Sequence, residues 1–152
     1  MKRPEPTRIR PDTQTSLRFS RQLRSGTSPE LLLRRELHRR GRRYLVHRPI
    51  PGLPRRRADL VFTRWRLAVF VDGCFWHGCP EHGVMPRSNS EWWGWKLEMN
   101  RERDRDTDQR LRELGWTVLR VWEHESPGLA ADRVEQILDA LARRPRGARD
   151  DR

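Results

Sequence analysis

Cysteine, lysine and long apolar segments are scarce in this sequence. Its 152 residues include only two cysteines, with four residues between them, which is too few for the disulfide framework of a small secreted protein. No stretch approaches the roughly 20 consecutive apolar residues that a transmembrane helix requires, and no apolar stretch of a secretory signal follows the basic opening segment. We therefore expect a cytoplasmic protein with reduced thiols and no membrane partner.

Positive charge is abundant. Lysine and arginine number 33 against 21 aspartates and glutamates, which gives a net charge of +12 and a pI near 11.4. Nearly all of the basic residues are arginine, because lysine occurs only at Lys2 and Lys96. Guanidinium groups bind phosphate oxygens with paired hydrogen bonds, so this composition indicates a nucleic acid partner. The alternative is a general preference for arginine that only solvates the surface.

The chain divides into three parts by charge and apolar content. Residues 1–26 are basic, include three prolines and have few apolar positions, so we expect an arm that becomes ordered only on a partner. Residues 27–142 have the length and apolar content of one domain. Residues 143–152 form a basic tail that we expect to be flexible.

Three segments of the domain have helical patterns. The first begins at a capping box formed by Thr27 and Glu30, and its leucines at positions 31–33 and 37 form the expected buried stripe. The second, 91–114, is charged almost all round in its middle, so either ion pairs between residues three apart support it or the charged face is functional. The third, 129–141, is amphipathic.

Short segments rich in β-branched and aromatic residues predict the strands. These segments are 44–46, 58–62, 67–71 and 116–122. The middle two are close enough to pair antiparallel, and the last is apolar enough for an inner strand. Residues 72–90 show neither the periodicity of a helix nor that of a strand. The order of elements predicts a three-layer α/β domain, with a small mixed sheet flanked by helices.

The loop without periodicity carries a potential zinc site. Cys74, Cys79 and His82 lie in this loop, and His124 follows the last predicted strand. Two thiolates and two imidazoles are a ligand set of closed, tetrahedral zinc sites, which stabilise small domains directly. We therefore predict a zinc-stapled loop with these four residues as the ligands. The alternative is two incidental buried cysteines and two surface histidines.

Two aspartates indicate a second metal site. Asp59 lies in one strand of the predicted hairpin and Asp72 ends the other, so both carboxylates are expected at one edge of the sheet, where they could hold Mg²⁺. His77 follows closely and could take a proton from an attacking water, as in a phosphodiesterase. The alternative is that the aspartates cap turns, that His77 binds zinc and that Glu30 acts only in its capping box.

Aromatic residues adjoin these acids. Phe75 and Trp76 lie between Cys74 and His77, and Trp92, Trp93 and Trp95 begin the long helix. Near a basic surface, aromatic rings can stack on bases or insert between base steps. Burial in the core is the alternative for each single tryptophan.

Four motifs of this region are specific enough to identify a family. They are Phe70-Val-Asp-Gly-Cys-Phe-Trp-His-Gly-Cys-Pro-Glu-His82, Trp92-Trp93-x-x-Lys96-x-x-x-Asn100-x-x-Arg103-Asp104, Glu113-Leu-Gly-Trp116 and Val121-Trp-Glu-His124. Together they strongly resemble the very-short-patch repair (Vsr) endonucleases, which nick DNA beside a T:G mismatch. The resemblance covers about residues 16–126. It implies a restriction-endonuclease-like fold, one structural zinc ion and catalytic magnesium.

The resemblance also implies roles for single residues. Asp59 matches the metal-binding aspartate, the Val71 carbonyl matches the main-chain magnesium ligand and His77 matches the general base. Glu30 matches an acidic residue that helps to hold metal-bound water. Asp72 occupies a position where some members carry histidine, and it would organise the same water.

Further positions match residues that contact DNA in the family. Phe75, Trp76 and Trp93 match aromatics that enter the duplex near the mismatch, and Lys96 and Asn100 match polar residues that face the wobble pair. The arm around positions 20–24 matches a segment that grips the DNA from the other side.

The function implied is that of a monomeric, Mg²⁺-dependent mismatch endonuclease that nicks one strand of duplex DNA. Mismatch-repair proteins are a further partner class suggested by this reading, and the enzyme would work on the nucleoid. Two alternatives are a nicking or restriction-type endonuclease of other specificity and a zinc-stabilised DNA-binding module without catalysis.

Overall fold

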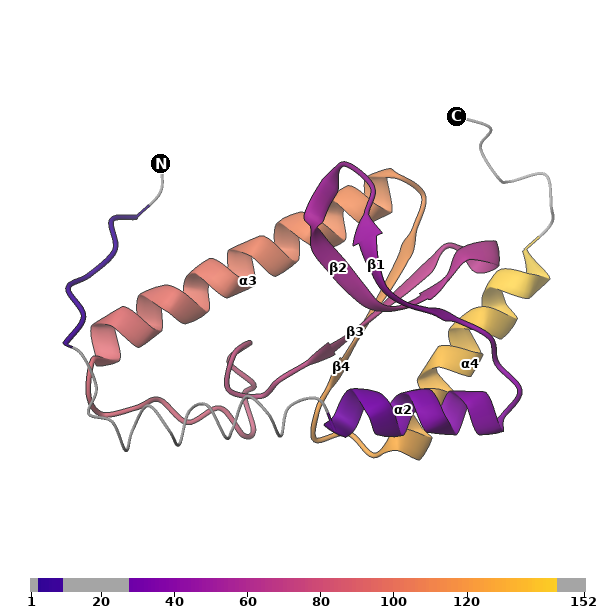
Figure 1. The fold of residues 1–152 in the computed structure, drawn as a ribbon, viewed down its shortest axis with the longest axis horizontal. Coiled ribbons are helices and arrows are strands. Elements are labelled where there is room, and N and C mark those ends of the chain that lie inside the picture. Colours follow the sequence, from indigo (N-terminus) through magenta and orange to yellow (C-terminus); the bar gives the residue numbers. More distant parts are fainter. Residues whose placement is uncertain (1–2, 10–27, 145–152) are drawn as a thin grey trace.

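The computed structural model describes residues 3–9 and 28–144 (Figure 1). Its elements are α2 (Ser28–Arg39), β1 (Leu45–Ile50), β2 (Leu53–Phe62), the short helix η1 (Thr63–Trp65), β3 (Leu67–Asp72), α3 (Ser90–Glu113), β4 (Thr117–Trp122) and α4 (Pro127–Arg143). Every predicted helix and strand is present, although β1 and β2 are longer than predicted. The expected cap residue Thr27 lies outside the described residues, as do 10–26 of the arm and 145–152 of the tail.

The four strands form one mixed sheet in the order β1-β2-β3-β4. β1 pairs antiparallel with β2, β2 pairs antiparallel with β3, and β3 pairs in parallel with β4. The predicted antiparallel hairpin of β2 and β3 is therefore confirmed. The prediction of an inner strand at 116–122 is wrong, because β4 lies at the edge of the sheet. Its apolar sequence has another cause, since helices cover both of its faces.

Helices cover the two faces of the sheet and make three layers (Figure 1). On one face, leucines of α2 and the apolar side of α4 pack against β2, β3 and β4. On the other face, Leu111 of α3 packs against a second cluster that includes Ala68 and Phe70 of β3. Only part of the predicted leucine stripe of α2 is buried. Leu33 and Leu37 are buried, whereas Leu31 and Leu32 are 41% and 45% exposed, because only one side of α2 faces the sheet.

The middle of the sheet opens toward one end. β2 and β3 pair only from Leu60↔Val69 to Phe62↔Leu67, so the described parts of the two strands are unpaired with each other beyond Val69. β3 continues in register with β4 as far as Asp72. The main chain of β3 is therefore accessible on its β2 side just before its end. At this opening, side chains of β2, β3, β4 and α3 line one pocket.

Residues 3–9 run along the beginning of α3. The indole Nε1 of Trp92 donates to Glu5 Oε1 at 2.9 Å, and the Arg8 guanidinium lies 4.4 Å from the centroid of the Trp92 ring. The Asn89 amide makes two hydrogen bonds with the main chain of Ile9. This part of the expected arm thus contacts the domain directly. No helix of the described chain is long and apolar enough to cross a membrane.

Candidate active site and metal-binding clusters

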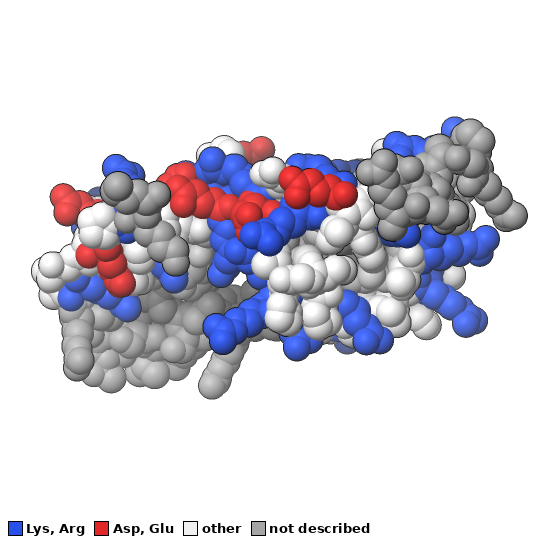
Figure 2. Space-filling view, turned by 90° about the horizontal axis from the view of Figure 1, so that it is seen from above, with Lys and Arg blue, Asp and Glu red and all other residues white. Residues whose placement is uncertain are grey.

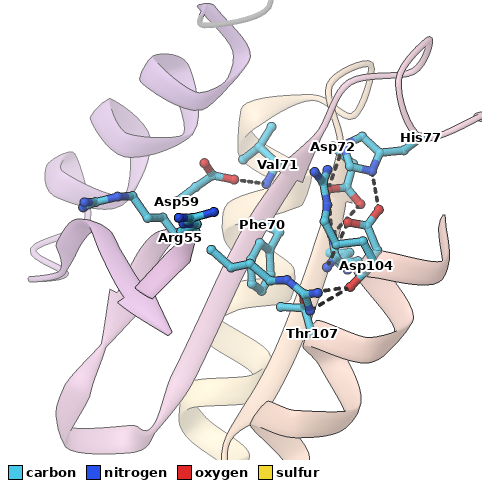
Figure 3. Close-up of a pocket in the computed structure, with 12 residues that line it drawn as sticks. Arg55, Asp59, Phe70, Val71, Asp72, His77, Asp104 and Thr107 are labelled. Atoms are coloured by element: carbon cyan, nitrogen blue, oxygen red, sulfur yellow. Dashed lines mark hydrogen bonds and ion pairs between the residues drawn. The ribbon is translucent and has the colours of Figure 1, made fainter. Parts of the chain in front are cut away.

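A pocket of about 480 Å³ lies where β2 and β3 separate (Figure 3). Residues of β2, β3, α3 and β4 line it, together with His77 from the loop after β3. The predicted site residues Asp59, Asp72 and His77 all line this pocket, and so does Val71. Asp59 reaches β3 from one side, whereas Asp72 and His77 lie on the other side of the strand (Figure 3).

The first side of the site is a carboxylate–histidine cluster formed by Glu30 of α2, His47 of β1 and Asp59 of β2. One ligand atom from each of these three side chains lies within 4.8 Å of the others. Asp59 Oδ2 accepts a hydrogen bond from the Val71 main-chain N–H at 2.8 Å, which the opening between β2 and β3 leaves accessible. Burial raises the pKa of Asp59 to about 6. The hydrogen bond from Val71 lowers this pKa and the negative charge of Glu30 raises it further.

The second side is an arginine–aspartate network around His77. His77 Nδ1 is hydrogen-bonded to Asp104 Oδ2 of α3, and His77 Nε2 lies 3.8 Å from Asp72 Oδ1. Burial opposes ionisation of Asp104, but the hydrogen bond and charge of His77, with Arg120, outweigh it and lower the pKa of Asp104. An ionised carboxylate can only accept, so His77 Nδ1 is the donor in this hydrogen bond, and Nε2 is the acceptor nitrogen whenever the imidazole is neutral.

Arg120 of β4 holds the aspartates of this network in place. Its guanidinium donates to Asp72 Oδ1 at 2.9 Å and to Asp108 Oδ1 at 2.8 Å, and it stacks 4.3 Å from the centroid of the Phe70 ring. Burial raises the pKa of Asp72, although the positive charges of Arg120 and His77 act against this shift. Asp72 is therefore committed to an ion pair within the protein.

His47 and Arg120 of this site were not predicted from the sequence, and Asp104 was part of a family motif but had no predicted role. Asp104 lies in the charged middle of α3, where pairs between residues three apart were expected. In the structure, Arg101 of this segment pairs with Glu98, while Asp104 faces the pocket. Of the two interpretations of this charged segment, a functional face is the one that agrees with the position of Asp104 at the pocket.

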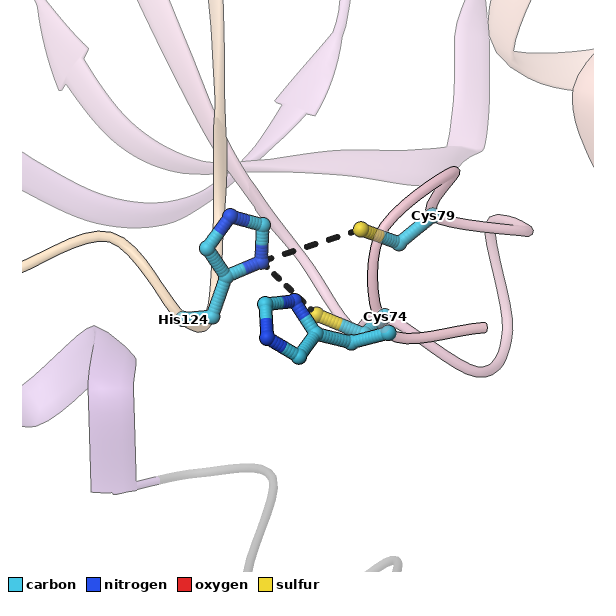
Figure 4. A group of neighbouring side chains, drawn as sticks. Cys74, Cys79 and His124 are labelled. Carbon is cyan, nitrogen blue, oxygen red and sulfur yellow. Dashed lines mark hydrogen bonds between the residues drawn. The ribbon is translucent and has the colours of Figure 1, made fainter. Parts of the chain in front are cut away.

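The predicted zinc ligands form a second group, the cysteine–histidine cluster (Figure 4). Ligand atoms of Cys74, Cys79, His82 and His124 all lie within 4.8 Å of one another. The distance from His124 Nδ1 is 3.1 Å to Cys74 Sγ and 3.7 Å to Cys79 Sγ. Ligands of a tetrahedral zinc ion with bonds of 2.0–2.3 Å are about 3.3–3.8 Å apart. The distance to Cys79 falls in this range and the distance to Cys74 is slightly shorter, so a small outward shift of Cys74 would accommodate this ion.

The surroundings of the cluster suit a cation as well. Burial raises the pKa of the Cys74 thiol to about 11, and the neighbouring Cys79 adds to the shift. A bound cation would reverse this effect by stabilising the thiolate. Glu81 Oε2 lies 3.5 Å from His124 Nε2, where a carboxylate can orient a ligating imidazole.

The predicted DNA-contacting aromatics pack into one group. The ring centroids of Phe75 lie 5.2 Å from both Trp76 and Trp93, which are 5.8 Å from each other. Phe75 and Trp76 are partly exposed, whereas Trp93 is only 6% exposed. Asn100 is 7% exposed and donates to the Trp76 carbonyl at 3.0 Å. In this structure Trp93 and Asn100 are thus buried against the loop, and their contact with DNA stays a prediction.

Basic side chains approach the pocket from two elements. Arg55, Arg56 and Arg57 of β2 and Arg103 of α3 line it. Arg56 is paired with Asp106, but within the described chain Arg55 and Arg103 have no ion pair with an acidic residue. In the view of Figure 2, basic side chains extend over most of the face, and acidic ones gather mainly in its upper part. Lys96 is partly exposed on α3, near the aromatic group.

Comparison with known proteins identifies the family. A family model described as "DNA mismatch endonuclease Vsr" matches residues 11–81. The chain is 47% identical over 121 residues to the type II nicking enzyme V.NaeI of Lentzea aerocolonigenes, an alignment that covers 78% of this chain and 70% of the relative. It is 43% identical over 124 residues to V.XorIIP, a type II nicking enzyme of Xanthomonas oryzae, which covers 78% and 88%. It is 45% identical over 76 residues to the DNA mismatch endonuclease Vsr of Escherichia coli, over 49% and 46% of the two chains. The protein is thus a DNA endonuclease and belongs to the Vsr family.

Proposed function

We propose that this endonuclease nicks one strand of duplex DNA beside a T:G mismatch, with His77 as general base and Mg²⁺ as cofactor. The observation that carries this proposal is the ion-paired His77–Asp104 couple in the same pocket as Asp59. A base and a potential metal ligand on opposite sides of one opening match the requirements of phosphodiester hydrolysis.

His77 would act through its second ring nitrogen. With its proton on Nδ1 and donated to Asp104, the imidazole presents Nε2 as an acceptor. Nε2 would remove a proton from a water molecule as the water oxygen forms a bond to phosphorus and one ester P–O bond breaks. Asp104 would stabilise the imidazolium that results.

Asp59 and the Val71 carbonyl would hold the metal, with Glu30 close by. The fit rests on the carboxylate–histidine cluster and on Glu30 Oε1, which is buried without a hydrogen-bond partner and so remains available. When bound, Mg²⁺ would stabilise charge that develops on the phosphate. Asp72 is engaged by Arg120, so we propose that it positions His77 and nearby water through its charge.

DNA would lie across the pocket and the aromatic group. Arg55 and Arg103 would contact backbone phosphates, since both line the pocket and neither makes a direct ion pair with an acidic side chain of the described chain. The partly exposed Phe75 and Trp76 would insert beside the mismatch, with Trp93 packed beneath them and Asn100 holding their main chain. Lys96 would face the displaced base pair. A wobble pair is already weakened, so insertion costs least there.

The cysteine–histidine cluster would hold a structural zinc ion, since its four ligands leave no position open for substrate. It would tie the loop that carries His77 to the end of β4. We further propose that the protein acts as a monomer on chromosomal DNA in the cytoplasm, with the arm of residues 1–26 gripping the duplex.

A nicking enzyme with a different specificity is the second candidate function. The relatives V.NaeI and V.XorIIP are both described as type II nicking enzymes, a description that does not mention a mismatch. The pocket chemistry would be the same in both cases, and only the aromatic group and Lys96 would act on a different feature of the DNA.

The test is strand nicking on three labelled duplexes that differ at one pair, T:G, C:G or T:A. Omitting Mg²⁺ is preferable to a chelator, which would also remove zinc. Cleavage of one strand of the T:G duplex alone, dependent on Mg²⁺, is the expected result. Equal nicking of all three duplexes would support the second candidate.

Asp59→Ala should abolish nicking and leave DNA binding intact. Asp139→Ala, which removes a surface carboxylate from α4, is the matched control and should behave as wild type. DNA binding by the zinc-loaded wild type with no nicking of any duplex would reject both functions.

A further inference from the structure

We infer that His47 is a direct nitrogen ligand of the active-site cation, together with Glu30 and Asp59. The inference rests on the proposed function and extends it to a residue of β1 that no motif in the sequence singles out. Three features of the structure carry it, namely the backbone of His47, the position of its ring and the state of the Glu30 carboxylate.

The backbone of His47 is in an uncommon conformation. Its φ is +51°, in the left-handed region that few residues other than glycine adopt, although histidine is among the residue types enriched there. The Arg57 guanidinium donates to the His47 carbonyl at 2.8 Å and holds this conformation. A strained residue within a strand is favoured only where the surrounding structure requires it, and such residues concentrate at functional sites.

The strain accompanies an irregularity that directs His47 and Asp59 to the same place. The pairs Val46↔Leu60 and Arg48↔Ala58 put His47 directly opposite Asp59, although this pair is missing from the ladder. Residues two apart in a regular strand share a face. Ala58 and Leu60, however, pack into the clusters on opposite faces of the sheet. This twist at Asp59 brings both side chains toward Glu30 of α2.

The ring of His47 lies at the distance expected for a neighbouring metal ligand. Its Nε2 is 3.1 Å from Glu30 Oε1, and adjacent ligands of an octahedral ion with bonds of about 2.1 Å are about 3.0 Å apart. The approach does not have hydrogen-bond geometry, so Glu30 Oε1 is buried without a hydrogen-bond partner. Arg34 lies 4.0 Å from the same oxygen, at the limit of an ion pair. A cation between the two side chains would satisfy both.

Mn²⁺ is the probe that tests the inference, because its electron spin reports bound nitrogen directly. One equivalent of Mn²⁺ is added to the zinc-loaded full-length protein, alone and with the T:G duplex. Pulsed electron paramagnetic resonance should then detect the ¹⁴N coupling of one coordinated imidazole. In His47→Asn this coupling should disappear and the Mn²⁺ affinity should fall by about tenfold or more. The matched control His38→Asn removes an exposed imidazole from the end of α2 and should change neither.

The variant His47→Gly distinguishes two possible roles of His47, as a metal ligand or as a residue that only shapes the strand. Glycine adopts a positive φ without strain, so this variant should have a higher Tm than wild type and still lose the ¹⁴N coupling. A coupling that persists in His47→Asn overturns the inference. So does wild-type protein that binds Mn²⁺ without any ¹⁴N coupling, or that binds no Mn²⁺ with or without DNA.

Nicking assays on the same samples distinguish the inference from the proposed function. Wild type that nicks the T:G duplex but shows no ¹⁴N coupling would retain the nuclease function and reject His47 as a ligand. Wild type that shows the coupling but nicks no duplex would retain the cation site and reject the proposed function.

Discussion

The two clusters of the candidate active site balance their charges differently. In the arginine–aspartate network, Arg120 pairs with Asp72 and Asp108, and Asp104 pairs with His77, so each of these acids has a basic partner. In the carboxylate–histidine cluster, Asp59 and Glu30 lie close together with His47 as their nearest basic group, and one buried oxygen of Glu30 has no hydrogen-bond partner. The charges of the arginine–aspartate network are compensated within the protein, whereas the carboxylate–histidine cluster could hold a cation.

This difference separates the roles of similar residues. Asp59 is half-buried and Asp72 is buried, both have raised pKa values, and sequence alone assigns both to the metal. Their partners distinguish them, because only Asp72 has a guanidinium bonded to its carboxylate. Charge compensation, more than residue type, therefore decides which acid can bind a metal ion.

The largest effect is expected from Asp104→Asn. The asparagine amide can donate to His77 Nδ1 and would move the imidazole proton to Nε2, where a base needs its lone pair. We expect kcat to fall by about 10²- to 10⁴-fold with KM unchanged. Single-turnover nicking measures this, and Asp132→Asn on the surface of α4 is the control. Unchanged kcat in Asp104→Asn would remove this couple from the mechanism.

Arg120→Leu should disrupt the arginine–aspartate network. It leaves Asp72 and Asp108 buried without their positive partner, which is expected to destabilise the fold by about 3 kcal/mol. Urea denaturation measures the loss. Adding Asp72→Asn and Asp108→Asn to Arg120→Leu should restore much of the stability, because no uncompensated charge then remains. A single variant as stable as wild type would contradict the network as described.

The pH dependence of stability should reveal the uncompensated charge of Asp59 in the carboxylate–histidine cluster. The pKa of Asp59 is about 6 in the folded chain and 3.8 as its ordinary value, so its contribution to stability is full below pH 3.8 and is lost as the pH rises through 6. In buffer without Mg²⁺, Asp59→Asn should therefore be more stable than wild type at pH 8, by up to about 3 kcal/mol. The difference should shrink toward pH 4. Thermal unfolding at several pH values tests this, and a difference that is constant with pH would contradict it.

The smallest effect is expected from Arg55→Gln at the rim of the pocket. Removing one phosphate contact should weaken duplex binding a few-fold at moderate salt and lower the slope of log K against log salt by about 1. Fluorescence anisotropy measures both. Arg64→Gln on η1, whose guanidinium lies over Trp65, is the control and should keep the wild-type slope.

The cysteine–histidine cluster was predictable because three of its members lie between positions 74 and 82 and because thiols and imidazoles are distinctive ligands. The element order and the hairpin of β2 and β3 were likewise predictable from short apolar segments. The edge position of β4 was not, because a strand covered on both faces by helices has the same apolar sequence as an inner strand.

The missed residues depend on tertiary geometry. His47 joins the site through a left-handed backbone and a change of side along β2, and neither has a periodic pattern. Arg120 lies in the middle of an apolar strand, and its three aspartates come from β3 and α3. Asp104 is one of many charges on a helix where any neighbour is a plausible partner.

Residues 74–79 concentrate several tasks in one short segment, which matters for protein engineering. Two thiols, two partly exposed aromatic rings and the His77 imidazole occupy this segment, and Asn100 fastens its main chain. If Phe75 and Trp76 contact the mismatch as proposed, a redesign of base-pair preference through either ring would also displace the imidazole next to them. The arginines of β2 lie on a separate element, so substrate affinity can be tuned there independently of this loop.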